Sequence, residues 1–352
     1  MVTTAPVVRE PSDLTPGWLA EILGSEVGEL DVERIGTGQM SQNYRVAWGD
    51  GESVVLKLAA EDAGSRATGV GLGAYQREIR FYREVAPRIG EPLAACHAAL
   101  YDDDEGWFTL VLEDVAPAHQ GDQIAGCSVD EARLAMRELA RIHAPVLGDP
   151  ELAASDWLNQ HSPLNQALLA QLLPGFLERY EDRVAPEHRE LCERMAESLD
   201  GWIADRRPPL GLAHGDYRID NMLFGEEGAP RPLTVVDWQT VSYGAAMMDA
   251  SYFLGASLTV DDRRAHEEEL LREYHSRLGE LGAPGFGWDE CWDGYRHQVF
   301  HGVVMAVAAS MLVERTERGD AMFMTMASRH SRHALDLGAP DLIAETRYPS
   351  TR

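Results

Sequence analysis

Most segments with strand character lie in the first third of the chain, and this uneven distribution limits the folds that the sequence can adopt. Apolar periodicity predicts, in chain order, strands over 32–35, 44–48 and 53–58, a helix over 75–86, and strands over 93–100 and 107–115. The glycines at 36–38 and the hairpin signal Asp50-Gly51 separate the first three strands. We therefore expect the chain to begin as an antiparallel sheet accompanied by a helix.

The remainder of the chain has a mostly helical pattern. A capping box from Ser128 to Glu131 predicts a long amphipathic helix that ends near His143, and only 210–236 returns to short apolar runs. The segment 114–127 is rich in Pro, Gly and polar residues, which suits a connection. A chain of 352 residues is long enough for two lobes. We predict an α+β fold with an N-terminal lobe over 1–115, a connection over 116–127 and a larger, mostly helical lobe over 128–352.

The composition limits the partners that the chain can have. Asp and Glu number 58 against 31 Lys and Arg, which gives a formal net charge of -27. Such a surface repels nucleic acid and anionic membranes, and it mildly favours cationic or neutral substrates. The 4 cysteines are far apart and form no C-x-x-C pair, as in a reduced cytosolic protein. Without a secretory signal or an apolar stretch long enough to span a bilayer, we expect a cytoplasmic protein with neither nucleic acid nor membrane as a partner.

A Gly-rich segment between two predicted strands is a candidate lid over phosphate groups. Gly36 and Gly38 would let backbone amides approach phosphate oxygens, and the Ser41 hydroxyl could add a donor. An ordinary Gly-rich turn is an alternative interpretation of the same residues.

One lysine interrupts an apolar strand. Lys57 follows Val54, Val55 and Leu56, and a buried ammonium without a partner is costly. Glu78 on the following helix could supply the counter-charge, and the pair would then hold the lysine over nucleotide phosphates. The alternative is an edge-strand lysine whose stem covers apolar surface while its ammonium stays in water.

The strongest motif is the segment from His214 through Asp216 to Asn221, followed downstream by Asp237 at the end of an apolar run. Asp216 would take or orient the proton of an attacking hydroxyl. Asn221 and Asp237 carry the hard oxygen donors that Mg²⁺ prefers when it also binds a triphosphate. An Asx-capped turn needs no catalysis. The order of the elements, from lid to lysine to glutamate to this loop to Asp237, favours phosphoryl transfer over that alternative.

Together these motifs resemble the aminoglycoside phosphotransferase and choline kinase-like superfamily, nearest to its ecdysteroid kinase-like (CHK kinase-like) members. The resemblance covers the chain from about Ile35 to at least Ala250. It implies the bilobal protein-kinase-like fold, ATP as phosphoryl donor, Mg²⁺, and phosphorylation of a hydroxyl on a small molecule. The motifs that carry it are Gly36 to Tyr44, Lys57, Glu78, Leu112-Glu113-Asp114, His214-Gly215-Asp216 through Asn221, and Asp237-Trp238-Gln239.

The resemblance also implies roles for single residues. Asp216 matches the catalytic base, and Asn221 and Asp237 match the metal ligands. Lys57 and Glu78 match the pair that positions the phosphates.

Three further features belong to the same comparison. The backbone from Glu113 to Val115 matches the strip that meets adenine. Asp249 resembles the buried aspartate that braces the catalytic loop, and a plain helix-start cap is the alternative. Trp238-Gln239 replaces the Phe-Gly of protein kinases, and no Ala-Pro-Glu motif follows, so protein substrates are not expected.

Two alternatives to a metabolite kinase stay open at this point. One is an antibiotic phosphotransferase for a cationic aminoglycoside, which the acidic composition would suit. The other is a nucleotide-binding pseudokinase that acts as a scaffold. The motifs define the reaction, whereas the acceptor is set by the variable helical lobe.

Overall fold

A computed structural model describes residues 5–36, 40–160 and 163–343. Contacts divide the chain into two units. Unit one comprises the residues up to His119 together with Leu223–Val241, and unit two comprises Gln120–Met222 and the residues from Ser242 onward. Each unit is described by itself below, and the predicted lobe boundaries at 116–127 stay a prediction.

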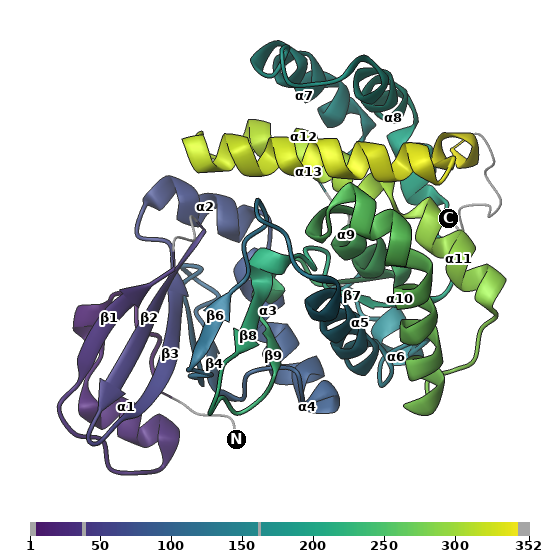
Figure 1. Ribbon diagram of the computed structural model, residues 1–352. Helices are drawn as coiled ribbons and strands as arrows, with labels where there is room; N and C mark the ends of the chain where they lie inside the picture. The colour runs from purple at the N-terminus through teal and green to yellow at the C-terminus, as the bar shows by residue number, and fades with distance from the viewer. Residues whose placement is uncertain (1–4, 37–39, 161–162, 344–352) are drawn as a thin grey trace. The chain divides into compact units, whose positions relative to one another are not determined.

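Unit one is built on a five-stranded sheet in the order β1-β2-β3-β5-β4, and Figure 1 labels β1, β2, β3 and β4 of this sheet. Every neighbouring pair in this sheet is antiparallel, which confirms the predicted N-terminal antiparallel sheet. The strands are β1 (Asp31–Ile35), β2 (Ser41–Trp48), β3 (Glu52–Ala59), β4 (Cys96–Tyr101) and β5 (Phe108–Glu113).

The alternation of side chains along β3 places an apolar set on one face of the sheet. Val54, Leu56 and Leu58 share a face and join the apolar core that also contains Leu19 of α1 (Pro16–Leu23). Lys57 lies between two of them in sequence and therefore points to the opposite face of the sheet.

Short helices and a second sheet complete unit one. The helix predicted over 75–86 is instead interrupted by a π-helical turn, which absorbs an extra residue and keeps Phe81, Tyr82 and Val85 buried. The remaining elements are η1 (Pro11–Asp13), α2 (Ala63–Gly71), α3 (Ala74–Arg80), η2 (Phe81–Val85), α4 (Ala86–Ile89) and η4 (Trp238–Thr240), with a three-stranded sheet of β6 (Ala118–Gln120), β8 (Met222–Gly225) and β9 (Leu233–Val235) in the order β6-β8-β9.

Unit two is mostly helical, as predicted for the larger C-terminal part (Figure 1). The predicted capping box of α5 is present, because Ser128 and Glu131 satisfy each other's backbone amides. The elements are α5 (Val129–His143), α6 (Pro150–Ala153), α7 (Gln166–Arg179), α8 (Pro186–Ala204), β7 (Leu210–Ala213), η3 (Ile219–Asn221), β10 (Ser242–Ala245), α9 (Met247–Ser257), α10 (Val260–Glu280), α11 (Trp288–His297), α12 (Phe300–Leu312), α13 (Glu317–Asp336) and η5 (Ala339–Leu342).

Helix α9 is the central helix of unit two. Its residues from Asp249 to Ser257 are all buried, and it contacts α5, α10, α11, α12 and α13. A helix that is buried on every side belongs to the interior of a larger protein. Side chains on α9 are therefore held on all sides by neighbouring helices.

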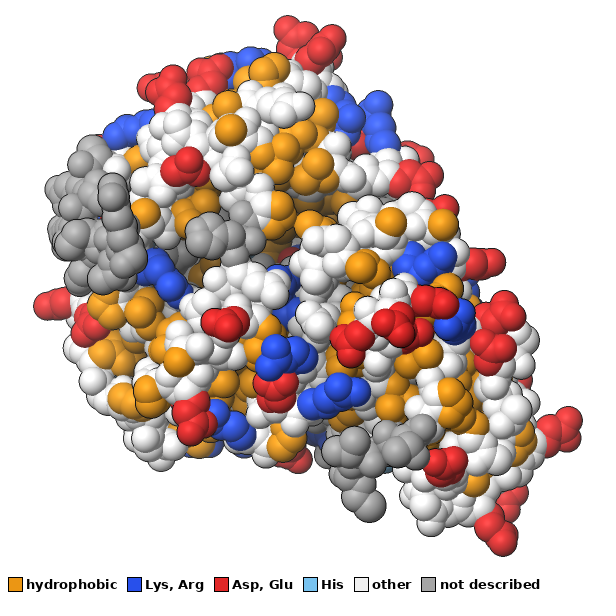
Figure 2. Space-filling view, turned by 180° about the vertical axis from the view of Figure 1, so that it is seen from behind, with side chains coloured by type: hydrophobic (Ala, Val, Ile, Leu, Met, Phe, Trp, Pro, Cys, Tyr) orange, Lys and Arg blue, Asp and Glu red, His pale blue; other side chains and the backbone are white. Residues whose placement is uncertain are grey.

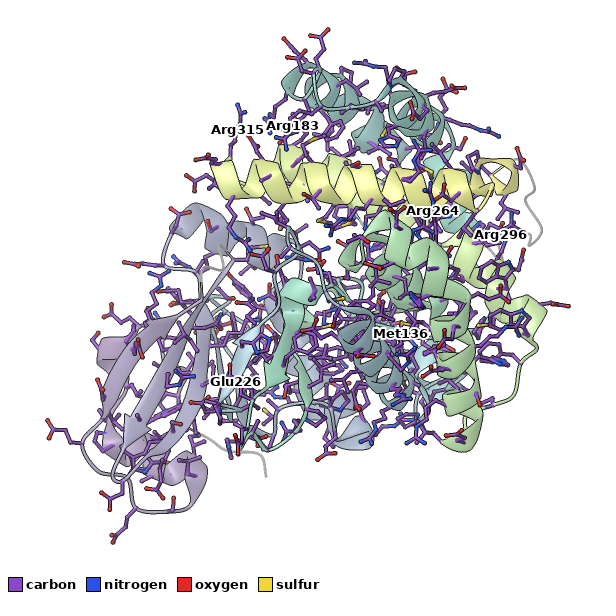
Figure 3. All side chains as sticks on the ribbon, viewed as in Figure 1. Met136, Arg183, Glu226, Arg264, Arg296 and Arg315 are labelled. Carbon is purple, nitrogen blue, oxygen red and sulfur yellow. The ribbon has the colours of Figure 1, made fainter. Side chains whose placement is uncertain are left out.

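Two arginines tie the C-terminal end of α13 to its neighbours, and both are labelled in Figure 3. Arg264 of α10 donates to the Asp336 carboxylate at 2.8 Å, and Arg296 of α11 donates to the Leu337 carbonyl at 2.7 Å. These contacts restrain α13, which carries residues that pack on α9.

On one face of the molecule (Figure 2), the acidic side chains are dispersed rather than gathered in one patch. On the face shown in Figure 2, Asp and Glu side chains lie singly and in small groups among apolar and basic ones. Within the described ranges, the structure contains no helix with both the length and the apolar character needed to cross a membrane.

Candidate functional site

The first group of predicted site residues lies in unit one and is centred on a buried lysine. Lys57 is 6% exposed, and its Nζ lies 2.8 Å from Glu78 Oε1 and 3.0 Å from Asp237 Oδ1. Strand β3 lies between β2 and β5, so Lys57 is not on an edge strand. Burial by itself would lower the pKa of Lys57, but the carboxylates of Asp237 and Glu78 outweigh it and raise that pKa. We call Lys57, Glu78, Asp237 and Trp238 the Lys57 group.

Glu78 links the lysine to the chain that follows Asp237. The same Glu78 Oε1 accepts a hydrogen bond from the Trp238 backbone amide at 3.2 Å. The Trp238 ring stacks on Phe81 with a centroid distance of 4.0 Å and an interplanar angle of 6°, and it is fully buried. The backbone next to Asp237 is therefore fixed by a carboxylate on one side and by an aromatic stack on the other.

Asp237 has an unusual backbone conformation. Its φ of 68° and ψ of 69° lie in the left-handed region, and it is the only non-glycine residue with positive φ in the described parts of the chain. Such a conformation costs about 1–2 kcal/mol for a residue with a Cβ. Strain of this kind collects at functional sites. The Asp237 side chain is 42% exposed, so the carboxylate of this strained residue is accessible to solvent as well as paired with Lys57.

The Gly-rich segment is only partly within the described residues. Gly36 is exposed with φ of 70°, a conformation that favours glycine, and Gly38 lies outside the described residues. Ser41 begins β2 opposite Ala59 and is buried. The adjacent backbone is anchored, because the Tyr75 hydroxyl donates to the Met40 carbonyl at 2.6 Å. A phosphate-binding role for this segment stays a prediction.

The segment predicted to meet adenine follows the end of β5. The Glu113 carboxylate accepts from the Ala95 amide at 3.0 Å and from Arg231 Nη2 at 2.8 Å. Burial would raise the pKa of Glu113, but these two donors outweigh it and lower that pKa. The Glu113 side chain is engaged and Val115 is buried, and the recognition of adenine by the backbone of this segment stays a prediction.

The second group lies in unit two and is centred on Asp216, in the loop after β7. Arg218 Nε donates to both carboxylate oxygens at 3.0 and 3.1 Å, and Asn221 Nδ2 donates to Oδ2 at 2.8 Å. The buried Tyr252 hydroxyl donates to Oδ1 at 3.1 Å. We call Asp216, Arg218, Asn221 and Tyr252 the Asp216 group.

Asp249 of α9 braces this loop through its backbone. Its carboxylate accepts from the His214 amide at 2.7 Å and from the Gly215 amide at 2.9 Å, and it lies 3.3 Å from His143 Nε2. Burial would raise the pKa of Asp249, but His143 and the backbone donors outweigh it and lower that pKa. The N-cap of α9 is Ala246, so Asp249 acts as a brace rather than as a helix-start cap.

The chemistry of two donors suits a magnesium ion. The Asn221 amide nitrogen is engaged with Asp216, which leaves the Asn221 amide oxygen as the atom for a metal. Asp237 adds a partly exposed carboxylate. Among the described residues, no cluster of three or more His, Cys, Asp or Glu side chains could hold a metal by itself. A role for Asn221 and Asp237 as Mg²⁺ ligands stays a prediction.

Three side chains that contact the loop around Asp216 were not predicted from the sequence. Arg218 lies two positions after Asp216, so charge pairing within the motif could have indicated it. Tyr252 lies three positions after Asp249 on the same helix, and that spacing places both on one side of α9. His301, whose Nε2 lies 2.9 Å from the Gly215 carbonyl, carries no sequence signal that connects it to this loop.

A comparison with protein-family models finds a match over most of the chain. The model of the phosphotransferase enzyme family matches residues 31–291. This range includes both the Lys57 group and the Asp216 group.

Solved structures with the same fold include several phosphotransferases. A protein assigned as an aminoglycoside phosphotransferase in Ralstonia eutropha JMP134 is 19% identical, with a TM-score of 0.57, 91% of this chain covered and 97% of that chain. The GDP complex of wild-type aminoglycoside 2'-phosphotransferase-IIIa is 16% identical, with a TM-score of 0.54 and 88% and 94% covered. Plasmodium vivax ethanolamine kinase is 10% identical, with a TM-score of 0.50 and 85% and 82% covered. These likenesses confirm the kinase-like fold.

One curated protein matches over a short segment. Acyl-CoA dehydrogenase family member 11 of Gallus gallus is 40% identical over 58 residues, which is 15% of this chain. The match spans 7% of that protein's length, so it describes a segment rather than the whole protein.

Proposed function

Because the chain belongs to the phosphotransferase enzyme family, we propose that it is an ATP-dependent kinase that transfers a phosphoryl group to a hydroxyl on a small molecule. The observation that carries this proposal is that Asp216 and Asn221 contact each other in a loop that buried Asp249 braces from behind. Such a loop is expensive to build for structure alone, since Asp249 is a fully buried carboxylate.

The Lys57 group would bind the nucleotide phosphates. The Lys57 ammonium is buried and held by two carboxylates, so its position is set before the nucleotide arrives. Preorganised charge of this kind stabilises phosphoryl transfer without reorganisation during the reaction. Mg²⁺ held through Asn221 and Asp237 would neutralise charge on the β- and γ-phosphates.

Asp216 would align the acceptor hydroxyl. Phosphoryl transfer depends mainly on positioning and charge. A carboxylate that accepts the hydroxyl proton positions the acceptor hydroxyl. Arg218 next to Asp216 adds a cation near the transferred group. The acceptor is therefore expected to place a hydroxyl within hydrogen-bond distance of Asp216.

The test is the Asp216→Asn variant, compared with Asp182→Asn, which removes an exposed carboxylate from the turn after α7. We expect Asp216→Asn to reduce phosphoryl transfer by about a hundredfold or more while Asp182→Asn leaves it unchanged. Both variants should keep the rise in melting temperature that ATP and Mg²⁺ produce together. Full turnover by Asp216→Asn on the true acceptor would show that Asp216 is not the base.

Two assays separate the alternative functions. A scaffold would show a nucleotide-dependent rise in melting temperature with no transfer to any acceptor, and a chain with neither would not be a kinase. Protection of a sensitive host on expression would favour the aminoglycoside phosphotransferase. GTP belongs in every assay beside ATP, because a structural relative was solved with GDP.

A further inference from the structure

Helix α9 contacts the candidate catalytic loop at two points. One contact is with the backbone of the loop, and the other is with the side chain of Asp216. Asp249 accepts from the His214 and Gly215 amides. One turn later on the same helix, Tyr252 donates to Oδ1 of the Asp216 side chain at 3.1 Å. A single buried helix therefore contacts both the backbone and the carboxylate of the loop.

The two neutral donors to Asp216 divide its oxygens between them. Tyr252 bonds Oδ1, whereas Asn221 bonds Oδ2 at 2.8 Å. Arg218 Nε contacts both oxygens and so does not distinguish them. A separate donor on each oxygen restrains rotation of the carboxylate, because rotation would break both bonds.

The ring of Tyr252 packs against two imidazoles. Tyr252 is 3% exposed, and its ring lies parallel to that of His330 at an angle of 4°, with a centroid distance of 5.1 Å. The His301 ring makes an edge-type contact with the same ring, with a centroid distance of 5.0 Å and an interplanar angle of 71°. Because the ring is buried and in contact with both imidazoles, the tyrosine has little freedom to swing its hydroxyl away from Asp216.

His330 contributes to this cluster by packing rather than by hydrogen bonding. It is 0% exposed, and neither ring nitrogen has a hydrogen-bond partner among the described residues. Burial lowers its pKa well below the ordinary value, so the ring is neutral. A Cβ on Gly302 would lie 2.2 Å from its Nδ1, and one on Gly255 would lie 2.6 Å from it. The two helices admit this imidazole only because both positions are glycine.

His301 connects the same cluster to the loop backbone. Its Nε2 lies 2.9 Å from the Gly215 carbonyl, and a carbonyl can only accept, so Nε2 carries the proton. Burial lowers the pKa of His301 as well, which leaves the neutral ring as the donor. The cluster of His301, His330 and Tyr252 therefore holds Gly215 and the Asp216 side chain together.

We propose that Tyr252, whose ring packs against His330 and His301, is a positioning residue that sets the orientation of the Asp216 carboxylate for phosphoryl transfer. This inference rests on the proposed function of Asp216. Tyr252 touches Asp216 and not the reacting groups, so it acts on the rate of transfer and leaves nucleotide binding unchanged.

The first experiment compares Tyr252→Phe with Tyr295→Phe. Tyr295 is an equally buried tyrosine of unit two whose hydroxyl bonds Glu267 at 3.1 Å, and it has no part in the Asp216 group. We expect Tyr252→Phe to lower kcat about tenfold with an unchanged KM for ATP, because the loss of one hydrogen bond changes a rate by about a factor of ten. Tyr295→Phe should keep kcat within about twofold of the wild-type protein. Equal kcat values for the two variants would overturn the proposal.

A second experiment does not depend on turnover and so separates this proposal from the proposed function. The urea midpoints of Tyr252→Phe, Asp216→Ala and the double variant form a cycle. We expect the double variant to shift the midpoint by less than the sum of the single shifts, because both single changes remove the same bond. Additive shifts would refute the contact. A wild-type protein that transfers phosphate to no acceptor would refute the proposed function, and the cycle would still decide whether Tyr252 restrains Asp216.

Discussion

The Lys57 group and the Asp216 group hold their carboxylates by different means. In the first, one buried ammonium serves two carboxylates, Glu78 and Asp237. In the second, one carboxylate, Asp216, receives donors from three side chains. Removal of one member therefore has unequal consequences. A missing lysine leaves a buried charge without compensation, whereas a missing donor leaves Asp216 with two others.

The largest expected effect is that of Lys57→Met, which tests the first half of this comparison. Glu78 would remain buried without its cation, so we expect the free energy of unfolding to fall by about 3–5 kcal/mol. Urea denaturation measures the change. The double variant Lys57→Met/Glu78→Gln should recover part of the loss, because the buried charge is removed with its partner. A fall in the free energy of unfolding of less than about 1 kcal/mol for the single variant would mean that the Lys57–Glu78 pair contributes no more than an exposed ion pair.

Asp249→Asn should have a smaller effect, and it sharpens the second half of the comparison. The remaining amide oxygen can accept from only part of the set formed by the two backbone amides and His143. We expect a loss of about 2 kcal/mol, since hydrogen bonds to a charged group are worth about 1.5–3 kcal/mol each. Asp182→Asn is the matched control and should lie within about 0.5 kcal/mol of the wild-type protein. A loss as large as that of Lys57→Met would remove the distinction between the groups.

The smallest expected effect is a difference in pH dependence. The pKa of Asp249 is lowered from 3.8, so its stabilising contribution is present above that pH and is lost as the pH falls through the lower folded value. The pKa of Lys57 is raised from 10.5, so its contribution is complete below that pH and is lost as the pH rises through the higher folded value. The stability gap between the wild-type protein and Asp249→Asn should narrow in acid. The gap to Lys57→Met should narrow in alkali, where the ammonium is lost, and also in acid, where Glu78 is protonated because burial raises its pKa. A gap that is constant over the whole range would contradict the corresponding assignment.

The sequence predicted those parts of the molecule that depend on local pattern. The apolar run over 53–58 predicted the strand that carries Lys57, and an unpaired ammonium in an apolar strand pointed to Glu78, which the structure places 2.8 Å away. The predicted helix over 75–86 was correct in position, but its π-helical turn was missed. Periodicity does not record where one extra residue is absorbed.

The sequence could not predict the contacts that hold Asp216 from behind. His301 and His330 lie on helices that contact α9 only after the chain has folded. No sequence pattern identifies the residue against which an isolated histidine in a helix will pack. The two glycines that leave room for His330 give no sequence signal either, since Gly255 and Gly302 are helical positions without a positive φ. Such contacts depend on how helices pack, and packing is a property of the whole core.

The division of unit one into two stretches of sequence has a consequence for synthesis on the ribosome. Residues 120–222 must be translated before Leu223–Val241 can join the N-terminal stretch, an interval of roughly 5–20 s at typical elongation rates. During that interval Lys57 and Glu78 have emerged without Asp237 and Trp238. The N-terminal stretch of unit one therefore stays incomplete until the ribosome has synthesised Leu223–Val241. For the same reason, no single cut in the chain releases unit one as a continuous fragment.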